Sequence, residues 1–140
     1  MKKHLLRNIL WCIFIFILCT MPVNDVVKTE VTIPFFDKIV HFIMFFIMGI
    51  FICSELIFQT KYSYRTISWI TILLVGLYGG IIELIQNYIF TYRSGDYYDL
   101  LADVLGGIFG VLMYPLLKKY KEYLLSSTKL GKIKILHKIL

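Results

Sequence analysis

Residues 34–58 read PFFDKIVHFIMFFIMGIFICSELIF, and this stretch decides the fold. Its charged residues, Asp37, Lys38 and Glu55, lie near the two ends, so that the middle is an apolar run. A helix that crosses a bilayer needs roughly 20 mostly apolar residues, and this run is long enough. Pro34 suits a first helical turn, where the amide hydrogen that proline lacks would be unbonded anyway. We therefore expect a membrane span over residues 34–58.

Three further apolar stretches accompany this span, at residues 8–21, 67–90 and 99–117. The first follows a basic segment as in a signal peptide, but residues 20–23 lack the small-x-small cleavage pattern, so we expect an uncleaved span. The hydrophobic fraction of 59% and the mean hydropathy of +0.75 exceed the values of ordinary soluble domains. The sequence thus predicts an all-α polytopic membrane protein, with a four-helix transmembrane bundle over residues 1–117.

The distribution of Lys and Arg predicts the orientation of this bundle. With both termini in the cytoplasm, the cytoplasmic segments hold twelve of the 15 Lys and Arg residues, and the outer segments hold Lys28, Lys38 and Arg93. Cytoplasmic loops of membrane proteins carry such an excess of basic residues. We therefore expect both termini to be cytoplasmic.

Seven of these basic residues lie in the expected tail, residues 118–140. The mixture of Lys with Leu and Ile in this tail predicts either a basic amphipathic helix in the membrane interface, with one apolar face, or a disordered basic segment. The apolar face would comprise Ile133, Leu136, Ile139 and Leu140. Because this charge adjoins a span and no soluble fold presents it, we expect contact with anionic membrane lipids and no nucleic-acid partner.

Ionisable and amide side chains gather at the expected outer ends of three spans. They are Asp37, Lys38 and His41 in the second span, Glu83, Gln86 and Asn87 in the third, Arg93, Ser94 and Asp96 in the next loop, and Asp99 and Asp103 in the fourth. Residues four apart share a helical face, which pairs Asp37 with His41 and Asp99 with Asp103. A carboxylate inside hydrocarbon costs at least about 2.5 kcal/mol, so each one requires protein or water partners.

Structural roles compete with functional ones at several of these positions. Glu83 should lie roughly 10 Å below the outer end of its helix, where Arg93 or a neighbouring amide is a possible partner. Asp96 suits a helix cap, since an acid in the first turn binds free amide hydrogens. Gly106 and Gly110 form a G-x-x-x-G pattern, which is typical of closely packed membrane helices. The glycines at 76, 79 and 80 suggest the same for the third span.

Taken together, these residues resemble the VanZ-like family over about residues 35–115. The matching pieces are Asp37-Lys38-x-x-His41-Phe42, Glu83-x-x-Gln86, Arg93-Ser94-Gly95-Asp96-x-x-Asp99, and Ala102-Asp103-x-x-Gly106 with Gly110. The sequence departs from the family pattern at Asp103, where asparagine is more usual. The family is named for a protein that lowers susceptibility to the glycopeptide teicoplanin. The resemblance implies a multi-pass protein of the bacterial cytoplasmic membrane with a role in the cell envelope, and it supplies no reaction.

Three kinds of function fit this pattern, and a purely structural polar cluster is the fourth reading. One is a protein that binds or masks an envelope lipid or peptidoglycan precursor, with Asp37, Lys38, Gln86, Arg93, Ser94 and Asp99 as binding residues. Another is a metal-dependent hydrolase or transferase, with Glu83, His41 and Asp103 as catalytic residues. A third is a proton- or cation-coupled carrier, which four helices would form only as an oligomer.

The charge of the expected site bears on these alternatives. Five carboxylates against Lys38 and Arg93 give a formal charge of −3 with a neutral histidine, which would repel a phosphate-bearing lipid. A bound divalent cation would remove that repulsion. Its candidate ligands are Asp37, His41, Glu83, Asp99 and Asp103. One imidazole with several carboxylates suits Mg²⁺, Mn²⁺ or Ca²⁺ better than structural zinc.

Overall fold

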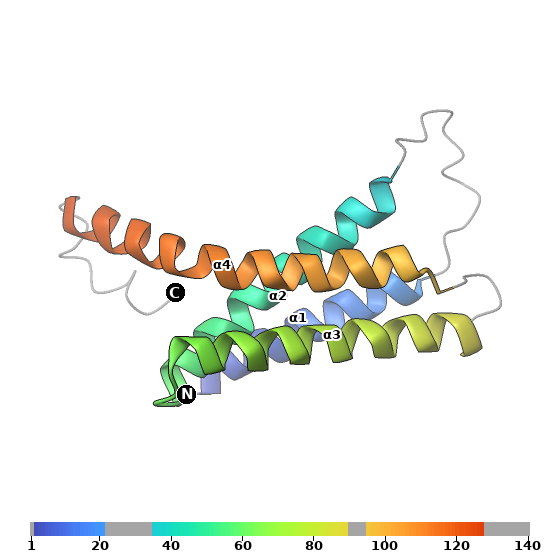
Figure 1. Ribbon diagram of the computed structural model, residues 1–140, viewed down its shortest axis with the longest axis horizontal. Coiled ribbons are helices and arrows are strands. Elements are labelled where there is room, and N and C mark those ends of the chain that lie inside the picture. The colour runs from blue at the N-terminus through green and yellow to red at the C-terminus, as the bar shows by residue number, and fades with distance from the viewer. Residues whose placement is uncertain (1, 22–34, 90–94, 128–140) are drawn as a thin grey trace.

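The computed structural model describes residues 2–21, 35–89 and 95–127, and within them the chain is all-helical (Figure 1). The helices are α1 (Lys2–Thr20), α2 (Phe36–Gln59), α3 (Tyr64–Ile89) and α4 (Tyr97–Ser127). Each corresponds to one of the four predicted apolar stretches, although α2 begins at Phe36 and not at residue 34, so the expected helical bundle is confirmed. Because consecutive helices run in opposite directions, the predicted polar ends of α2, α3 and α4 come to the same end of the bundle.

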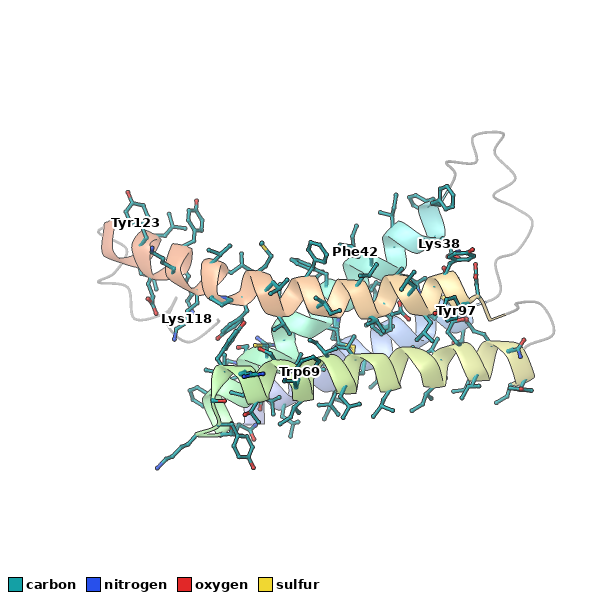
Figure 2. The ribbon with its side chains drawn as sticks, viewed as in Figure 1. Lys38, Phe42, Trp69, Tyr97, Lys118 and Tyr123 are labelled. Carbon is teal, nitrogen blue, oxygen red and sulfur yellow. The ribbon has the colours of Figure 1, made fainter. Side chains whose placement is uncertain are left out.

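Three of the four helices have the length and composition of membrane spans. These are α2, α3 and the Tyr97–Leu125 part of α4. The apolar part of α1, His4–Thr20, is shorter and lies near the lower limit of about 17 residues for a spanning helix. Large apolar side chains, Trp69 among them, project from the outside of the bundle, as expected for a surface that faces lipid (Figure 2). The fold is therefore that of a multi-pass membrane protein.

Glycines bring α2 and α4 into direct backbone contact where the two helices cross (Figure 1). A Cβ atom added at Gly106 would overlap the carbonyl oxygen of Phe42, and one at Gly110 would overlap that of Phe46. One added at Gly49 would lie 2.8 Å from the carbonyl oxygen of Gly107. The predicted role of the G-x-x-x-G pattern in helix packing is thus confirmed, and its partner is α2.

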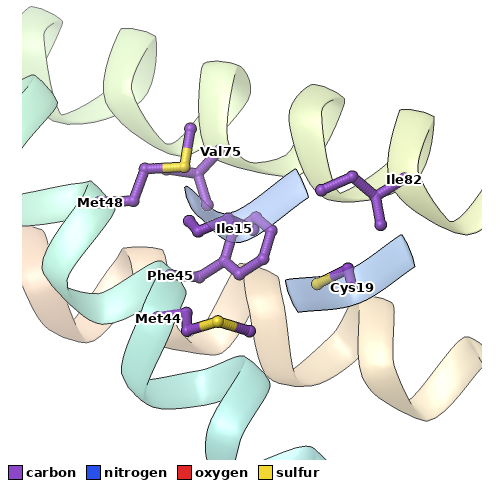
Figure 3. Packing of buried hydrophobic residues seen from close by; sticks show 7 residues of the cluster. All are labelled: Ile15, Cys19, Met44, Phe45, Met48, Val75 and Ile82. Atoms are coloured by element: carbon purple, nitrogen blue, oxygen red, sulfur yellow. The ribbon is translucent and has the colours of Figure 1, made fainter. Parts of the chain in front are cut away.

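A compact apolar core joins α1, α2 and α3 (Figure 3). Its buried members are Ile15 and Cys19 of α1, Met44, Phe45 and Met48 of α2, and Val75 and Ile82 of α3. Two hydrogen bonds attach α1 to this core: Trp11 Nε1 donates to the carbonyl of Met44 over 3.1 Å, and the Tyr78 hydroxyl donates to that of Cys12 over 2.6 Å. Helix α1 therefore packs as a member of the bundle, on α2 and α3.

The last helix is longer than the sequence predicts. We expected the fourth span to end at residue 117 with a separate tail beyond it, but α4 continues through Pro115 to Ser127. A proline inside a helix leaves the carbonyl four residues earlier without its amide donor. Here that carbonyl belongs to Val111, and the Tyr64 hydroxyl donates to it over 2.5 Å. The expected apolar face of the tail lies in residues 128–140, outside the described residues.

Removing this hydroxyl tests the account of α4. In Tyr64→Phe the Val111 carbonyl loses its donor inside the bundle, and the free energy of unfolding should fall by about 1–3 kcal/mol. Denaturation in mixed micelles, followed by circular dichroism, measures the change. Tyr62→Phe is the control, because the Tyr62 side chain is exposed and makes no such bond among the described residues. Equal stability of Tyr64→Phe and wild type would contradict the account.

Candidate functional site

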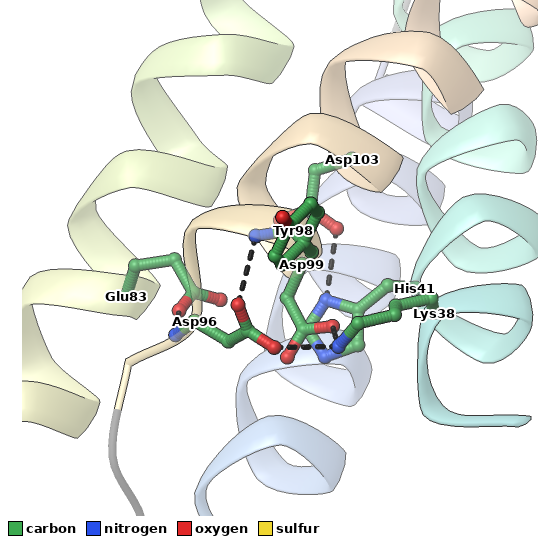
Figure 4. A network of polar contacts seen from close by, with 7 residues as sticks. All are labelled: Lys38, His41, Glu83, Asp96, Tyr98, Asp99 and Asp103. Atoms are coloured by element: carbon green, nitrogen blue, oxygen red, sulfur yellow. Dashed lines mark hydrogen bonds and ion pairs between the residues drawn. The ribbon is translucent and has the colours of Figure 1, made fainter. Parts of the chain in front are cut away.

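A buried polar cluster lies where the ends of α2, α3 and α4 meet (Figure 4). Its members are His41 of α2, Glu83 of α3, and Asp99 and Asp103 of α4. All four are less than 9% exposed. Lys38 on α2 and Asp96 just before α4 lie at its outer edge and are less buried. The three spans that the sequence predicts to share a site therefore contribute to one buried polar cluster.

His41 and Asp103 form the most deeply buried pair in the cluster. The Nδ1 atom of His41 lies 2.9 Å from Oδ1 of Asp103, and the two side chains are 1% and 0% exposed. When Asp103 is ionised it can only accept, so that Nδ1–H is the donor. Gly79 makes room for the carboxylate, since a Cβ atom there would lie 2.7 Å from Oδ2 of Asp103. Nε2 of the imidazole has no hydrogen-bond partner in the described part of the chain, and the Cys19 side chain of α1 lies close enough to interact with the ring.

Glu83 is fastened to the start of α4 by one of its two oxygens. The backbone N–H of Asp96 donates to Oε2 of Glu83 over 2.8 Å. Gly95 allows this approach, because a Cβ atom there would lie 2.7 Å from the Glu83 carbonyl oxygen. The expected alternative partner, Arg93, lies outside the described residues, as does Ser94. A backbone hydrogen bond thus positions Oε2 of Glu83, while Oε1 has no hydrogen-bond partner among the described residues.

Lys38 and Asp96 connect α2 to the beginning of α4. The Nζ atom of Lys38 lies 2.6 Å from Oδ2 of Asp96 and 2.9 Å from Oδ1 of Asp99. The other Asp96 oxygen accepts the N–H of Tyr98 over 2.9 Å. Asp96 is therefore the helix cap that the sequence predicts. Lys38, in contrast, already has two carboxylate partners before any ligand binds.

The contact between Lys38 and Asp96 should make stability depend on pH. The Lys38 ammonium, and after it the Tyr98 N–H, lowers the pKa of the Asp96 carboxyl below its usual value. The stabilisation is then fully present above the unfolded-state pKa, near 4, and is lost as the pH falls through the lowered folded-state pKa. We expect acidification below about pH 4 to destabilise the wild type more than Asp96→Asn in acid titrations of unfolding. Equal slopes for the two proteins would contradict this.

Three polar atoms in the cluster are buried without a hydrogen-bond partner in the described part of the chain. They are Nε2 of His41, Oε1 of Glu83 and Oδ2 of Asp103. These three residues can each offer one ligand atom such that the atoms lie within 4.8 Å of one another. A second such set consists of Asp37, His41 and Asp99, in which Asp37 is exposed. Imidazole nitrogen with carboxylate oxygens could hold a divalent cation such as Mg²⁺ or Mn²⁺.

Gln86, a predicted binding residue, attaches α3 to α1. Its Nε2 donates to the carbonyl oxygen of Cys19 over 2.7 Å, and the side chain is 1% exposed. No residue pattern predicts a contribution from α1 at this end of the bundle. A backbone carbonyl leaves no side-chain signature, so only the packing of the helices could reveal it.

An elongated groove between α3 and α4 approaches the cluster from the outside of the bundle. Its volume is about 540 Å³, and its lining is mostly apolar, with Glu83, Asn87 and Asp96 at one end. Gly76 and Gly80 help to form it: a Cβ atom at Gly80 would meet nothing within 4 Å. Among the three α3 glycines, only Gly79 is in close contact with a neighbouring helix, where a Cβ atom would lie 2.7 Å from Oδ2 of Asp103. The prediction that all three serve close packing is therefore wrong. Glu83 belongs to both the groove and the buried cluster.

Comparisons with known proteins agree with the family resemblance seen in the sequence. A family model described as VanZ/LLP1 matches residues 4–118. An uncharacterized protein of the fission yeast Schizosaccharomyces pombe is 33% identical over 90 residues, which cover 62% of this chain and 51% of the yeast protein. The chain thus spans about half the length of this curated relative. No solved structure matches it.

Proposed function

Since the chain belongs to the VanZ/LLP1 family, we propose that it binds an amphipathic component of the cell envelope and modifies its polar head at the buried cluster. The apolar part of this ligand would lie in the groove between α3 and α4. Its head would reach His41, Glu83 and Asp103 through the end of the groove at Glu83. Envelope lipids and lipid-linked peptidoglycan precursors have this chemistry.

The observation that carries the proposal is the set of three unpartnered polar atoms. Buried polar groups in proteins nearly always have a partner, and inside a membrane bundle an unpartnered one is especially unfavourable. The three atoms come from three different helices, and the residues that carry them can each bring one ligand atom to within 4.8 Å of the others. A ligand that donates hydrogen bonds, or a cation, would provide the partners that these atoms lack.

The His41–Asp103 pair supports a chemical role for this site. A carboxylate that accepts from one imidazole nitrogen orients the ring and makes the other nitrogen a better base. His41 Nε2 would then take the proton from a water molecule or hydroxyl group, whose oxygen bonds to the carbon or phosphorus atom of an ester or phosphoryl group of the head. The bond from that atom to the leaving oxygen breaks, and the imidazolium gives its proton to the leaving oxygen. The ion pair between Lys38 and Asp99 would form the wall of the head-group site on the side toward the end of the bundle.

A metal-dependent hydrolase or transferase is the second candidate, and the two ligand sets favour it. A cation held by Glu83 and Asp103 would offset their negative charge and allow an anionic head to approach. Both candidates place the site on the extracytoplasmic side of a bacterial cytoplasmic membrane, following the count of basic residues. Sequestering or altering a peptidoglycan precursor there would also change susceptibility to glycopeptides, as with the family's founding member.

Mass spectrometry of material that copurifies with the protein tests this proposal. We expect the wild type and Lys119→Gln, an exposed change far from the cluster, to carry the same amphipathic compound. Glu83→Gln should lose most of it. Incubation of the purified protein with envelope lipids should produce a mass change in the lipid that His41→Leu abolishes. No enriched compound and no mass change would overturn the proposal, and loss of turnover with chelators would select the metal-dependent candidate.

A further inference from the structure

The opposite end of the bundle holds a second cleft, between α1, α2 and the part of α4 beyond Pro115. Its volume is about 450 Å³. We refer to it as the basic cleft and define it by Arg7, Phe51, Lys118, Lys121 and Glu122. Figure 2 shows Lys118 at the end of α4 far from Lys38 and Tyr97, which lie near the buried cluster. The basic cleft is therefore separate from the candidate functional site.

The α4 wall of the cleft is one continuous helical face. Lys118, Lys121, Glu122 and Leu125 follow the i, i+3, i+4, i+7 spacing that brings side chains to the same side of a helix. This face exists only because α4 continues past Pro115. A fourth span that ended at residue 117, as we expected, would leave the lysines in a separate tail.

The charge in the cleft is unbalanced. Three cations, Arg7, Lys118 and Lys121, line it together with one acid, Glu122. None of the three cations forms an ion pair within residues 2–21, 35–89 and 95–127. Outside the lining, Glu55 lies close enough to Arg7 to attract it; its Oε1 accepts from Gln59, and its Oε2 has no partner among the described residues. A lining with this excess of positive charge suits an anion.

Arg7 is held in a fixed position at the base of the cleft. Its guanidinium carbon lies 4.1 Å from the centre of the Phe51 ring, and Nη2 donates to the Phe51 carbonyl over 3.1 Å. Its Nε is buried and has no acceptor among the residues that the structure describes. A guanidinium fixed in this way is a prearranged donor for an anionic oxygen, and carboxylates and phosphates are its usual partners.

The position of the cleft favours a lipid over a soluble anion. Ile50, Leu117 and Leu125 continue its lining as apolar surface beside the charged residues. A phospholipid at a membrane surface likewise has a charged phosphate next to apolar acyl chains. Basic pockets between spanning helices near the cytoplasmic face suit anionic head groups, and the count of basic residues predicts that this end is cytoplasmic.

From these features we propose that the basic cleft binds the phosphate group of an anionic phospholipid. The proposal does not depend on the function of the buried cluster. Phosphatidylglycerol is the probe, phosphatidylcholine the zwitterionic comparison, and inorganic phosphate the comparison without acyl chains. Binding to the full chain in detergent is measured by native mass spectrometry and by the shift in melting temperature.

We expect phosphatidylglycerol to raise the melting temperature of the wild type, and the two comparison compounds to have little effect. The double variant Lys118→Gln/Lys121→Gln should bind it roughly thirtyfold more weakly, or about fivefold for each lysine. Lys119→Gln, which removes the same charge from the neighbouring position outside the cleft, should bind it as the wild type does. Equal binding by the double variant, or an equal effect of phosphatidylcholine, would overturn the proposal. An equal shift in melting temperature with inorganic phosphate would show that the cleft binds a free anion and not a lipid.

Discussion

Gly106→Ala is expected to destabilise the protein by about 3 kcal/mol, although it adds only one methyl group. The new Cβ would overlap the carbonyl oxygen of Phe42 and would also lie 2.9 Å from the amide nitrogen of Phe46. Both are backbone atoms of α2, so no side chain can rotate away. Helices α2 and α4 would have to separate, which would also pull His41 from Asp103. The free energy of unfolding in mixed micelles measures the effect.

Gly80→Ala is the matched control for this change. A Cβ atom at Gly80 would meet nothing within 4 Å, and alanine has the higher helix propensity. We expect this variant to be as stable as the wild type or slightly more stable. If Gly106→Ala were as stable as Gly80→Ala, the close contact between α2 and α4 would not exist as described.

His41→Leu is expected to cost about 3 kcal/mol or more of stability, and to abolish any chemistry at the cluster. The change leaves the carboxylate of Asp103, which is fully buried, without its partner. Removing one member of a buried ion pair is more harmful than removing both, because the remaining charge stays in a medium of low dielectric constant. Unfolding titrations give the stability, and the lipid assay above gives the function.

The double variant His41→Leu/Asp103→Leu separates the two effects. Leucine has the same number and branching of side-chain heavy atoms as aspartate and is close in volume to histidine, so we expect stability within about 1.5 kcal/mol of the wild type. Ligand binding and turnover should nevertheless be lost. Retained binding in this stable double variant would show that the pair serves packing alone.

The sequence predicts the helices well because a bilayer restricts the choice of structure so strongly. Apolar runs such as residues 34–58 have to be helical, since hydrocarbon offers no partner for an open backbone. Helical spacing then predicts that His41 lies on the face of Asp37 and Asp103 on the face of Asp99. It also predicts that three spans present these faces at one end, which the buried cluster confirms.

Other features depend on contacts between helices that no spacing along the chain encodes. Helical periodicity gives no reason for His41 to face Asp103 while Lys38 faces Asp96. That pairing follows from the angle at which α2 crosses α4. The continuation of α4 past Pro115 likewise depends on Tyr64, which lies in another helix. Local sequence rules correctly identify proline as a helix breaker, and a tertiary hydrogen bond overrides them here.

The central claim is that His41, Glu83 and Asp103 surround a ligand and do not merely hold the bundle together. An experimental structure of the protein, extracted with its native lipids, tests this most directly. The account predicts non-protein density in contact with Nε2 of His41, Oε1 of Glu83 and Oδ2 of Asp103, continuous with or adjoining density in the groove between α3 and α4. A structure in which these three atoms bond only to protein groups, with no density among them, would contradict it.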